Sequence, residues 1–428
     1  MAGHIPQGIP ADGGPQRATV YAWLVFALSF GLLMSDYMAR QVLNAVGPLL
    51  KQEWLLSDTQ VASLASVVSL AVGVLTLPLS LLADRFGRVR SLVAMAVLWS
   101  LATLLCGWAE NYPQLLAARL LVGVGEAAYG SVGIAVVISV FPVSMRSTLA
   151  SAFLAGTVVG QVLGVAIGAQ VAATYGWRVA FVVIGLSGLA LAAIYPLVVR
   201  ESRLGVPPPR EPFNLRVLTR QVLGSRVLQL SYFGSGIQLF CTGTLAVFLP
   251  LLFTRHYAMA LAQAGQATAI ALLICAVGMV CCGMLSDRIA VRRPHALPFA
   301  AIGFALVSAL LFALAFAAPP GAFQLAMLGG GLLVVAGVAG VAGAMVANLT
   351  PKAVHSTAMA TLALANNLVG LAPGPLITGW LADRSDLLHA LMILPLPCLL
   401  SALAFVLARR GYRNALGGVE RVAGIEPA

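Results

Sequence analysis

Twelve stretches of about 20 or more mostly apolar residues run through this chain of 428 residues and constrain its fold more than any other feature. A helix of about 20 apolar residues spans the hydrocarbon core of a bilayer. Only helices and closed barrels cross that core, because its backbone groups have no water to bond. With 60% apolar and 9% charged residues, the composition is that of a polytopic membrane protein. We therefore predict an all-α membrane protein with twelve transmembrane helices. The predicted helices are 20–46, 61–82, 91–109, 113–140, 147–174, 177–199, 227–253, 264–285, 296–318, 323–349, 355–381 and 387–408.

The basic residues predict how these helices are oriented. If both termini are cytoplasmic, nineteen lysines and arginines lie on the cytoplasmic side. Only Lys51, Arg178, Arg255 and Arg384 lie on the other side. This bias follows the positive-inside rule, so it also accounts for the net charge of +11 without nucleic-acid binding. The first residues lack a basic flank before a short apolar run, so we expect no cleaved signal peptide.

The longest connection divides the helices into two groups of six. Residues 200–226 contain three consecutive prolines and six arginines, which indicates a solvated cytoplasmic linker. The predicted organisation has five parts, and residues beyond Gly411 are small and polar enough that we expect disorder there. The parts are a cytoplasmic tail (1–19), a six-helix bundle (20–199), the linker (200–226), a second six-helix bundle (227–410) and a cytoplasmic tail (411–428).

An internal repeat supports this division. Asp84-Arg85 after the second helix recurs as Asp287-Arg288 after the eighth, at an offset of 203 residues. Other basic residues recur at an offset of 206, pairing Arg146 with Lys352 and Trp177-Arg178 with Asp383-Arg384. Two pseudo-symmetric halves around a site near the bilayer midplane are typical of secondary transporters, in which one half rocks against the other.

Four ionisable residues lie well inside the predicted helices: Asp36, Arg40, Arg119 and Glu126. A charge at the bilayer centre costs about 2.5–3.5 kcal/mol on insertion scales, and such residues usually face a bundle interior or a watery cavity. Arg119 and Glu126 are seven residues apart and share a helix face, while Asp36 and Arg40 are spaced i and i+4. We predict Glu126, with Asp36 second, as the proton-coupling residue, and Arg40 or Arg119 as partner of a carboxylate or an anionic substrate. The alternative is that the four charges only neutralise one another and fix helix packing.

Neutral residues complete the candidate site. Tyr37 and Tyr129 are candidates for the wall of a cavity, and Gln238 and Asn366 for hydrogen bonds to a substrate, although such residues also bond neighbouring helices. On the predicted fifth helix, small residues recur every four positions, a spacing that lets helices approach closely. These are Gly156, Gly160, Gly164 and Gly168.

The sequence lacks the residue patterns that enzyme chemistry requires. The five histidines lie at helix ends and in loops, and no Gly-rich phosphate loop precedes a lysine and serine. The six cysteines lie in apolar segments without metal-ligand spacing, so we predict no metal and no cofactor.

The sequence motifs resemble those of the major facilitator superfamily. The segment 80–90, with Asp84, Arg85, Gly87 and Arg88, resembles the family's signature loop, although Ser80 stands where the family prefers glycine. Asp287-Arg288 resembles its degenerate second copy. The resemblance places the first and fourth helices, with all four charges, around one central cavity. The Asp84 carboxylate can cap or pair with basic groups at a neighbouring helix end, which predicts a loop that latches the two halves on the cytoplasmic side and breaks when the protein opens inward. The alternative is that the basic residues of the loop only enforce the topology.

The segment 119–129, ending Gly-Glu-Ala-Ala-Tyr, is similar to the Spinster-like branch, whose members export lysophospholipids or sphingoid phosphates. Relatives place an acid directly before the arginine of the first helix, where this chain has Ala39 and carries Asp36 one turn earlier.

We expect a monomeric, proton-coupled secondary transporter of the bacterial inner membrane. Its expected partners are a small organic anion or amphipathic molecule, protons and the lipid bilayer, with no nucleic acid. The alternatives are a proton-driven drug or lysolipid exporter, and a receptor of the same fold that binds its ligand without moving it.

Overall fold

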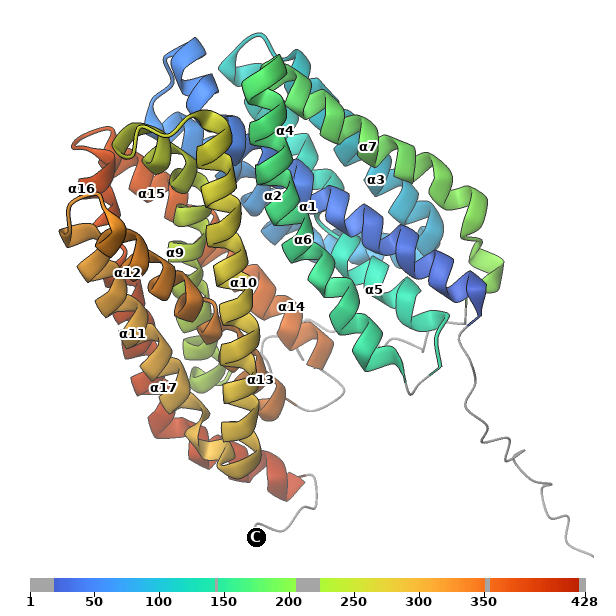
Figure 1. Ribbon diagram of the computed structural model, residues 1–428. Helices are drawn as coiled ribbons and strands as arrows, with labels where there is room; N and C mark the ends of the chain where they lie inside the picture. The colour runs from blue at the N-terminus through green and yellow to red at the C-terminus, as the bar shows by residue number, and fades with distance from the viewer. Residues whose placement is uncertain (1–18, 143–144, 205–223, 351–354, 423–428) are drawn as a thin grey trace, which may run out of the picture.

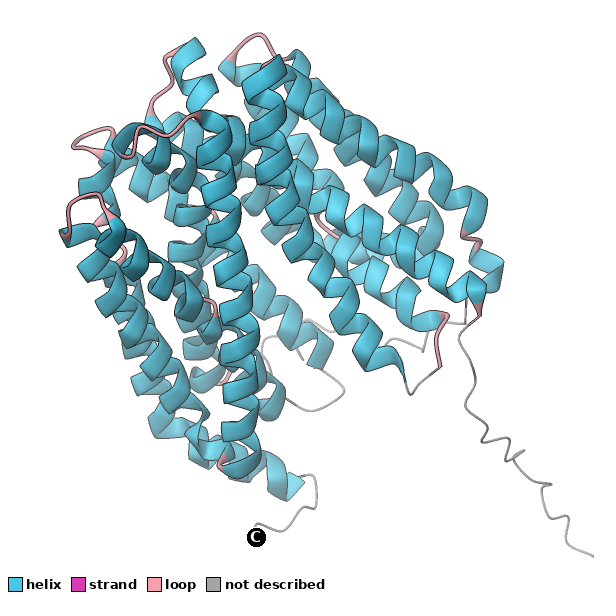
Figure 2. Cartoon of the chain, in the orientation of Figure 1, coloured by secondary structure: helices cyan, strands magenta, loops and turns pink. Residues whose placement is uncertain are grey.

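The computed structural model describes residues 19–142, 145–204, 224–350 and 355–422. Within these ranges every regular element is a helix, and twelve helical segments are long and apolar enough to span a membrane, which confirms the predicted fold class (Figures 1 and 2).

Most of the spanning segments are single helices, but some consist of two or three consecutive elements. The first half contains α1 (Val20–Trp54), α2 (Asp58–Phe86), α3 (Arg88–Trp108), α4 (Tyr112–Glu126) followed by α5 (Tyr129–Ser139), α6 (Arg146–Tyr175) and α7 (Trp177–Val198). The second contains α9 (Arg226–His256), α10 (Leu261–Arg292), α11 (Leu297–Ala317), α12 (Ala322–Val335) followed by α13 (Gly337–Leu349), then α14 (His355–Ala365), η6 (Asn366–Leu371) and α15 (Pro373–Ala382), and finally α16 (Leu387–Leu391) with α17 (Pro395–Val422).

Local sequence explains where these helices begin. Ser57 and Gln60 form a reciprocal capping box at the start of α2, and the Asn111 side chain accepts from the Gln114 amide at the start of α4. Gly87 alone separates α2 from α3 with φ 92°, a left-handed conformation that glycine adopts without steric cost.

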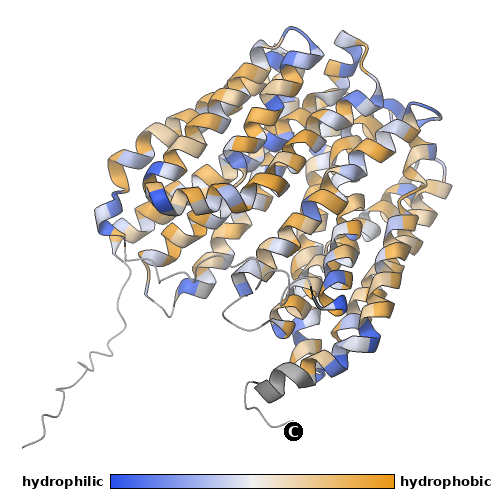
Figure 3. Cartoon of the chain, turned by 180° about the vertical axis from the view of Figure 1, so that it is seen from behind, coloured by the Kyte–Doolittle hydropathy of each residue, from blue (hydrophilic) through white to orange (hydrophobic). Residues whose placement is uncertain are grey.

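The surface of the two bundles suits lipid. Figure 3 shows hydrophobic residues over most of the length of the helices and hydrophilic residues at many of their ends. Leu310 on α11 and Leu403 on α17 are 60% and 53% exposed. Apolar surface of this extent would be a liability in water, so it fits a bilayer environment.

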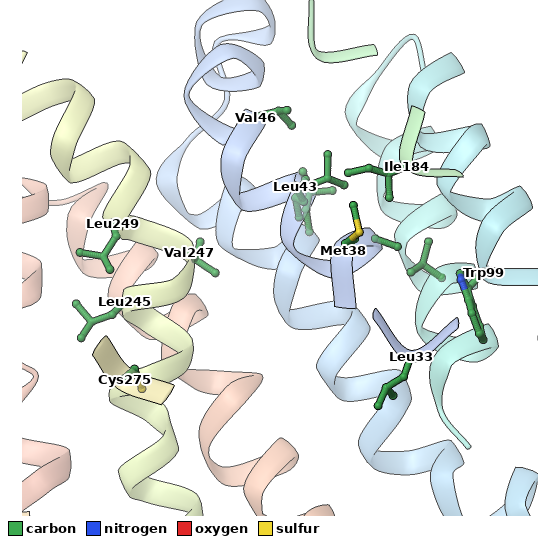
Figure 4. Packing of buried hydrophobic residues seen from close by; sticks show 14 of the residues in the cluster. Leu33, Met38, Leu43, Val46, Trp99, Ile184, Leu245, Val247, Leu249 and Cys275 are labelled. Atoms are coloured by element: carbon green, nitrogen blue, oxygen red, sulfur yellow. The ribbon is translucent and has the colours of Figure 1, made fainter. Parts of the chain in front are cut away.

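One cluster of buried apolar side chains reaches into both halves. Figure 4 shows Leu43 of α1 beside Ile184 of α7, while Leu245, Val247 and Leu249 lie along α9 of the second half. α1, α2 and α6 pack against α9, α10, η6 and α15, and these contacts join the halves.

The fourth helix of each half is interrupted, whereas the sequence predicts two continuous helices. The break after Glu126 lies at Ala127 and Ala128, and Thr76 of α2 donates to the Ala127 carbonyl at 2.8 Å. In the second half, α12 ends at Val335 and α13 starts at Gly337. A neighbouring hydroxyl can thus satisfy backbone freed at such a break inside the membrane.

The C-terminal tail differs from the prediction. We expected disorder beyond Gly411, but α17 continues to Val422, with Tyr412 fully buried. This buried aromatic side chain docks the helix extension on the second bundle. The N-terminal tail up to residue 18, Lys352 and most of the linker lie outside the described residues.

Candidate functional site

Three of the four intramembrane charges meet in one buried cluster. The Nε atom of Arg40 lies 2.7 Å from Oε2 of Glu126 and 3.7 Å from Oδ1 of Asp36. Both carboxylate side chains are buried, whereas Arg40 is 19% exposed. The close approach to Glu126 is an ion pair by distance, but its angles do not make it a hydrogen bond, so both Glu126 oxygens lack a hydrogen-bond partner among the described residues. Two carboxylates therefore share one guanidinium, an arrangement that can exchange a proton or an anion.

Arg119 has different surroundings. Arg119 is 1% exposed, and its guanidinium donates to three backbone carbonyls, those of Leu64, Ala39 and Arg40, at 3.2, 2.9 and 3.4 Å. The predicted pairing of Arg119 with a carboxylate has no counterpart among the ion pairs of the described residues. Arg119 fastens α4 to α1 and α2, and leaves Arg40 as the arginine that faces both acids.

Two glycines bring Glu126 to this position. A methyl group at Gly123 would lie 2.8 Å from the Ala71 side chain, and one at Gly125 would lie 2.6 Å from the Trp99 backbone nitrogen. These contacts are too short for any other residue, so α4 can approach α2 and α3 closely only with glycine at both places. The helix then ends at Glu126 itself.

The two tyrosines of the predicted site have separate roles in the structure. The Tyr37 ring lies against Arg40, with 5.1 Å between the guanidinium carbon and the ring centroid. Tyr129 is fully buried, donates to the Ser29 carbonyl at 2.8 Å and meets Trp99 edge-on. Of the two tyrosines, Tyr37 is the one whose ring lies against Arg40 of the charge cluster.

The polar residues of the second half bond to neighbouring helices. Gln238 is 1% exposed and donates weakly to the Cys398 sulfur, at 3.6 Å. Asn366 accepts a 2.8 Å hydrogen bond from Ser235. Asn366 also begins η6, a π-helical turn that the sequence did not predict, and such turns are frequent at functional sites.

The glycine ridge of α6 lies against α1. Methyl groups at Gly160 and Gly164 would come within 2.4 and 2.8 Å of the α1 backbone at Met34 and Met38. Gly156 and Gly168 face the same helix. The ridge thus brings α6 against the helix that carries Asp36 and Arg40.

A second set of charges, which was not predicted from the sequence, joins the two halves at the end of the molecule away from the chain termini. Asp58, at the start of α2, lies 2.6 Å from the Lys51 ammonium and 2.8 Å from the Arg255 guanidinium of the second half. Asp383, after α15, accepts from the Thr59 amide at 3.0 Å and also from the Asp58 amide and the Thr59 hydroxyl. We call Lys51, Asp58, Thr59, Arg255 and Asp383 the clasp. Two features of the sequence could have indicated the clasp. They are the basic residues Lys51 and Arg255 on the side of the membrane with few charges, and the Asp383-Arg384 pair within the internal repeat.

Asp383 is ionised over an extended pH range. Partial burial alone would raise the pKa of its carboxyl, but the hydrogen bonds from Thr59 and from the α2 amides outweigh burial and hold the pKa below its ordinary value. The positive end of the α2 dipole acts in the same direction.

The predicted latch loop is held by the linker. Glu201, in the short helix η2 (Glu201–Arg203), accepts hydrogen bonds from the Arg88 and Val89 amides at 2.9 and 2.7 Å. Arg85, Asp287 and Arg288 are exposed, and no ion pair joins the loop to the second half among the side chains that the structure describes. Glu201 had no role in the sequence analysis, because only the fold brings it to the start of α3.

Comparison with known proteins agrees with this architecture. The chain is 28% identical to protein spinster homolog 1 of Bos taurus over 406 residues, which cover 88% of this chain and 76% of that protein. It is 30% identical to the probable L-galactonate transporter of Escherichia coli (strain K12) over 197 residues, which cover 45% of this chain and 43% of that protein. The match therefore spans less than half of the L-galactonate transporter.

A solved structure shares the fold over almost the whole chain. It is a bacterial homologue of the human lysosomal transporter Spinster in an inward-facing, unoccupied conformation, and it superimposes with a TM-score of 0.84 at 19% identity, covering 93% of this chain and 99% of that one.

Twelve helices long and apolar enough to span a membrane, together with similarity to named transporters, identify a multi-pass membrane transporter rather than an enzyme. The chain belongs to the Major Facilitator Superfamily, whose sequence profile matches residues 28–294 and 231–424.

Proposed function

We propose that this protein is a proton-coupled transporter that moves a small organic anion across the membrane by alternating access. The observation that carries the proposal is that Asp36 and Glu126 share Arg40 in a buried site. A proton bound by Glu126 removes the charge that holds Arg40, and the guanidinium can then pair with an anionic group of the substrate. When the substrate leaves, Arg40 returns to the carboxylate and the proton is released.

Arg40 is a better candidate than Arg119 for binding the substrate, because its side chain is partly exposed and has free hydrogen-bond donors. Arg40 keeps 19% of its side chain exposed, and its two terminal nitrogens make no hydrogen bond to the described residues. A guanidinium binds carboxylate or phosphate through two parallel hydrogen bonds, so both groups fit as the substrate's anionic part. Similarity to an L-galactonate transporter supports a carboxylate substrate.

The clasp supports an inward-open state for this conformation. The halves are joined by the clasp at the end away from the termini, and Figure 1 shows them farther apart toward the other end. We assign the termini to the cytoplasm of a bacterial cell, by the positive-inside rule, and treat the transporter as a monomer of the inner membrane.

Export of an amphipathic anion such as a lysolipid is the second candidate. Its support is the similarity to spinster homolog 1 over 88% of the chain, together with the resemblance of residues 119–129 to the Spinster-like branch. Arg40 would bind the phosphate of such a substrate, so the two candidates share the site, but export would exchange the substrate for a proton instead of carrying both together.

The coupling assignment is tested with Glu126→Gln in proteoliposomes. Ligands are first identified by thermal-shift screening of sugar acids, aromatic acids and lysophospholipids at two pH values, since a ligand stabilises the folded state by mass action. We expect Glu126→Gln to lose accumulation driven by a pH gradient while it retains counterflow exchange, because the variant can no longer bind and release the proton.

Glu53→Gln is the matched control, because Glu53 lies at the end of α1 and pairs with Arg178 outside the cluster. It should accumulate substrate like the wild type. Full gradient-driven accumulation by Glu126→Gln would remove Glu126 as the coupling site. Wild-type protein that binds a ligand without counterflow would be a receptor instead of a transporter.

A further inference from the structure

Two grooves lie at positions related by the internal repeat. One, of about 360 Å³, is formed by the end of α2 and the start of α3 with a contribution from Val124 of α4, and includes Leu82, Phe86 and Arg90. The other, of about 460 Å³, lies at the end of α10 and includes Leu285, Ile289 and Arg293. Each residue of the first trio corresponds to one of the second at the offset of 203 residues that also relates Asp84-Arg85 to Asp287-Arg288.

The two grooves share their chemistry as well as their position. Phe86 is 65% exposed, and Leu82 and Leu285 are 46% and 48% exposed, so an apolar wall faces outward from each half. Arginines lie at the polar end of both grooves: Arg90 in the first groove, and Arg288, Arg292 and Arg293 in the second, all exposed. None of these four arginines forms an ion pair with a side chain that the structure describes.

We propose that each groove binds one anionic phospholipid from the membrane leaflet on the side of the chain termini. An acyl chain lies along the apolar wall, and the phosphate pairs with the arginine at the helix end. Apolar residues would be in contact with the chains of any lipid, so the arginines give the preference for a negative headgroup. Basic pockets on the cytoplasmic side of a membrane protein are suited to such headgroups.

The proposal is independent of the transported substrate, because neither groove contains a member of the Asp36, Arg40 and Glu126 cluster. Both grooves lie on segments that resemble the superfamily's signature loop and its copy. Bound lipids would therefore contact the two equivalent corners of the halves that move during transport.

Native mass spectrometry of the detergent-solubilised protein with phosphatidylglycerol tests the proposal by counting retained lipids. We expect two for the wild type, one for Arg90→Gln, one for the triple variant Arg288→Gln/Arg292→Gln/Arg293→Gln, and none when all four changes are combined. Arg410→Gln, an exposed arginine on α17 outside both grooves, should retain two.

Two further measurements distinguish lipid binding from a general attraction of anions. Ala94→Trp fills the first groove and leaves Arg90 in place, so it should reduce the count to one. Glycerol 3-phosphate, which has the charge without the acyl chains, should not be retained. Equal retention of phosphatidylcholine and phosphatidylglycerol, or equal counts for Arg90→Gln and Arg410→Gln, would overturn the proposal. Unfolding temperatures without lipid check that every variant is folded.

Discussion

Arg40 and Arg119 lie within one bundle, but their neighbours give them different roles. Arg119 is enclosed by the carbonyls of Leu64, Ala39 and Arg40, whereas Arg40 meets two carboxylates and keeps an accessible edge. The sequence predicted that all four intramembrane charges belong together, because an unpaired charge in a bilayer is costly. The sequence could not distinguish the roles of the two arginines. The hydrogen-bond acceptors of Arg119 are backbone atoms, and their positions depend on how three helices pack.

This difference predicts that Arg119→Lys destabilises the protein more than Arg40→Lys. A lysine cannot reproduce the planar guanidinium that reaches three carbonyls, and hydrogen bonds from charged groups contribute about 1.5–3 kcal/mol each. We expect Arg119→Lys to lower the unfolding temperature in detergent by several degrees, and Arg40→Lys to change it little while weakening substrate binding. An unchanged unfolding temperature for Arg119→Lys, together with lost binding, would assign Arg119 to the substrate site instead.

At the scale of elements, hydropathy predicted all twelve spanning helices, because the length of an apolar segment is set by the thickness of the bilayer. The breaks within them were not predictable in the same way. The interruption after Glu126 occurs between alanines, good helix formers, and the neighbouring Thr76 hydroxyl bonds the Ala127 carbonyl there. Likewise, no feature of the local sequence indicates the π-helical turn at Asn366.

The packing of α6 on α1 makes a prediction about the glycine ridge. A methyl group at Gly160 would lie 2.4 Å from the Met34 carbonyl oxygen and 2.8 Å from the Tyr37 side chain. Gly160→Ala should therefore push the two helices apart and lower the unfolding temperature. It should also reduce transport, because α1 carries the charge cluster.

Gly303→Ala is the matched control, since nothing lies within 4 Å of the added methyl group on α11. Alanine favours a helix over glycine by about 1 kcal/mol, so this variant should be as stable as the wild type or more so. If both variants behaved alike, close approach would not be what the ridge provides.

At the scale of the whole molecule, removing a carboxylate from the clasp should have a different effect from removing one from the buried cluster. Asp383 joins the second half to the start of α2, so Asp383→Asn should shift the protein away from the conformation described here. Distance measurements between spin labels placed on the two halves at the end of the molecule opposite the clasp should then show a larger population with that end closed. An unchanged distance distribution would mean that Asp383 does not contribute to the equilibrium.

The pH dependence separates the clasp from the cluster. Because the folded-state pKa of Asp383 is held below its ordinary value of 3.8, its contribution is present above that value and is lost only as the pH falls through the depressed pKa. Acidification from pH 8 to pH 5 should leave the hydrogen bonds of the Asp383 carboxylate intact. The difference in unfolding temperature between Asp383→Asn and the wild type, measured in detergent, should therefore be the same at pH 8 and pH 5, and a difference that shrinks at pH 5 would contradict this.

The four intramembrane charges all belong to the first half, and the predicted helices of the second carry none in their interiors. The repeat thus preserves a shape in two copies and the intramembrane charges in only one. Substitutions in the second half can therefore change the surface that faces a substrate and leave the charge cluster of the first half unchanged. A chain built this way can exchange one cargo for another around the same set of intramembrane charges.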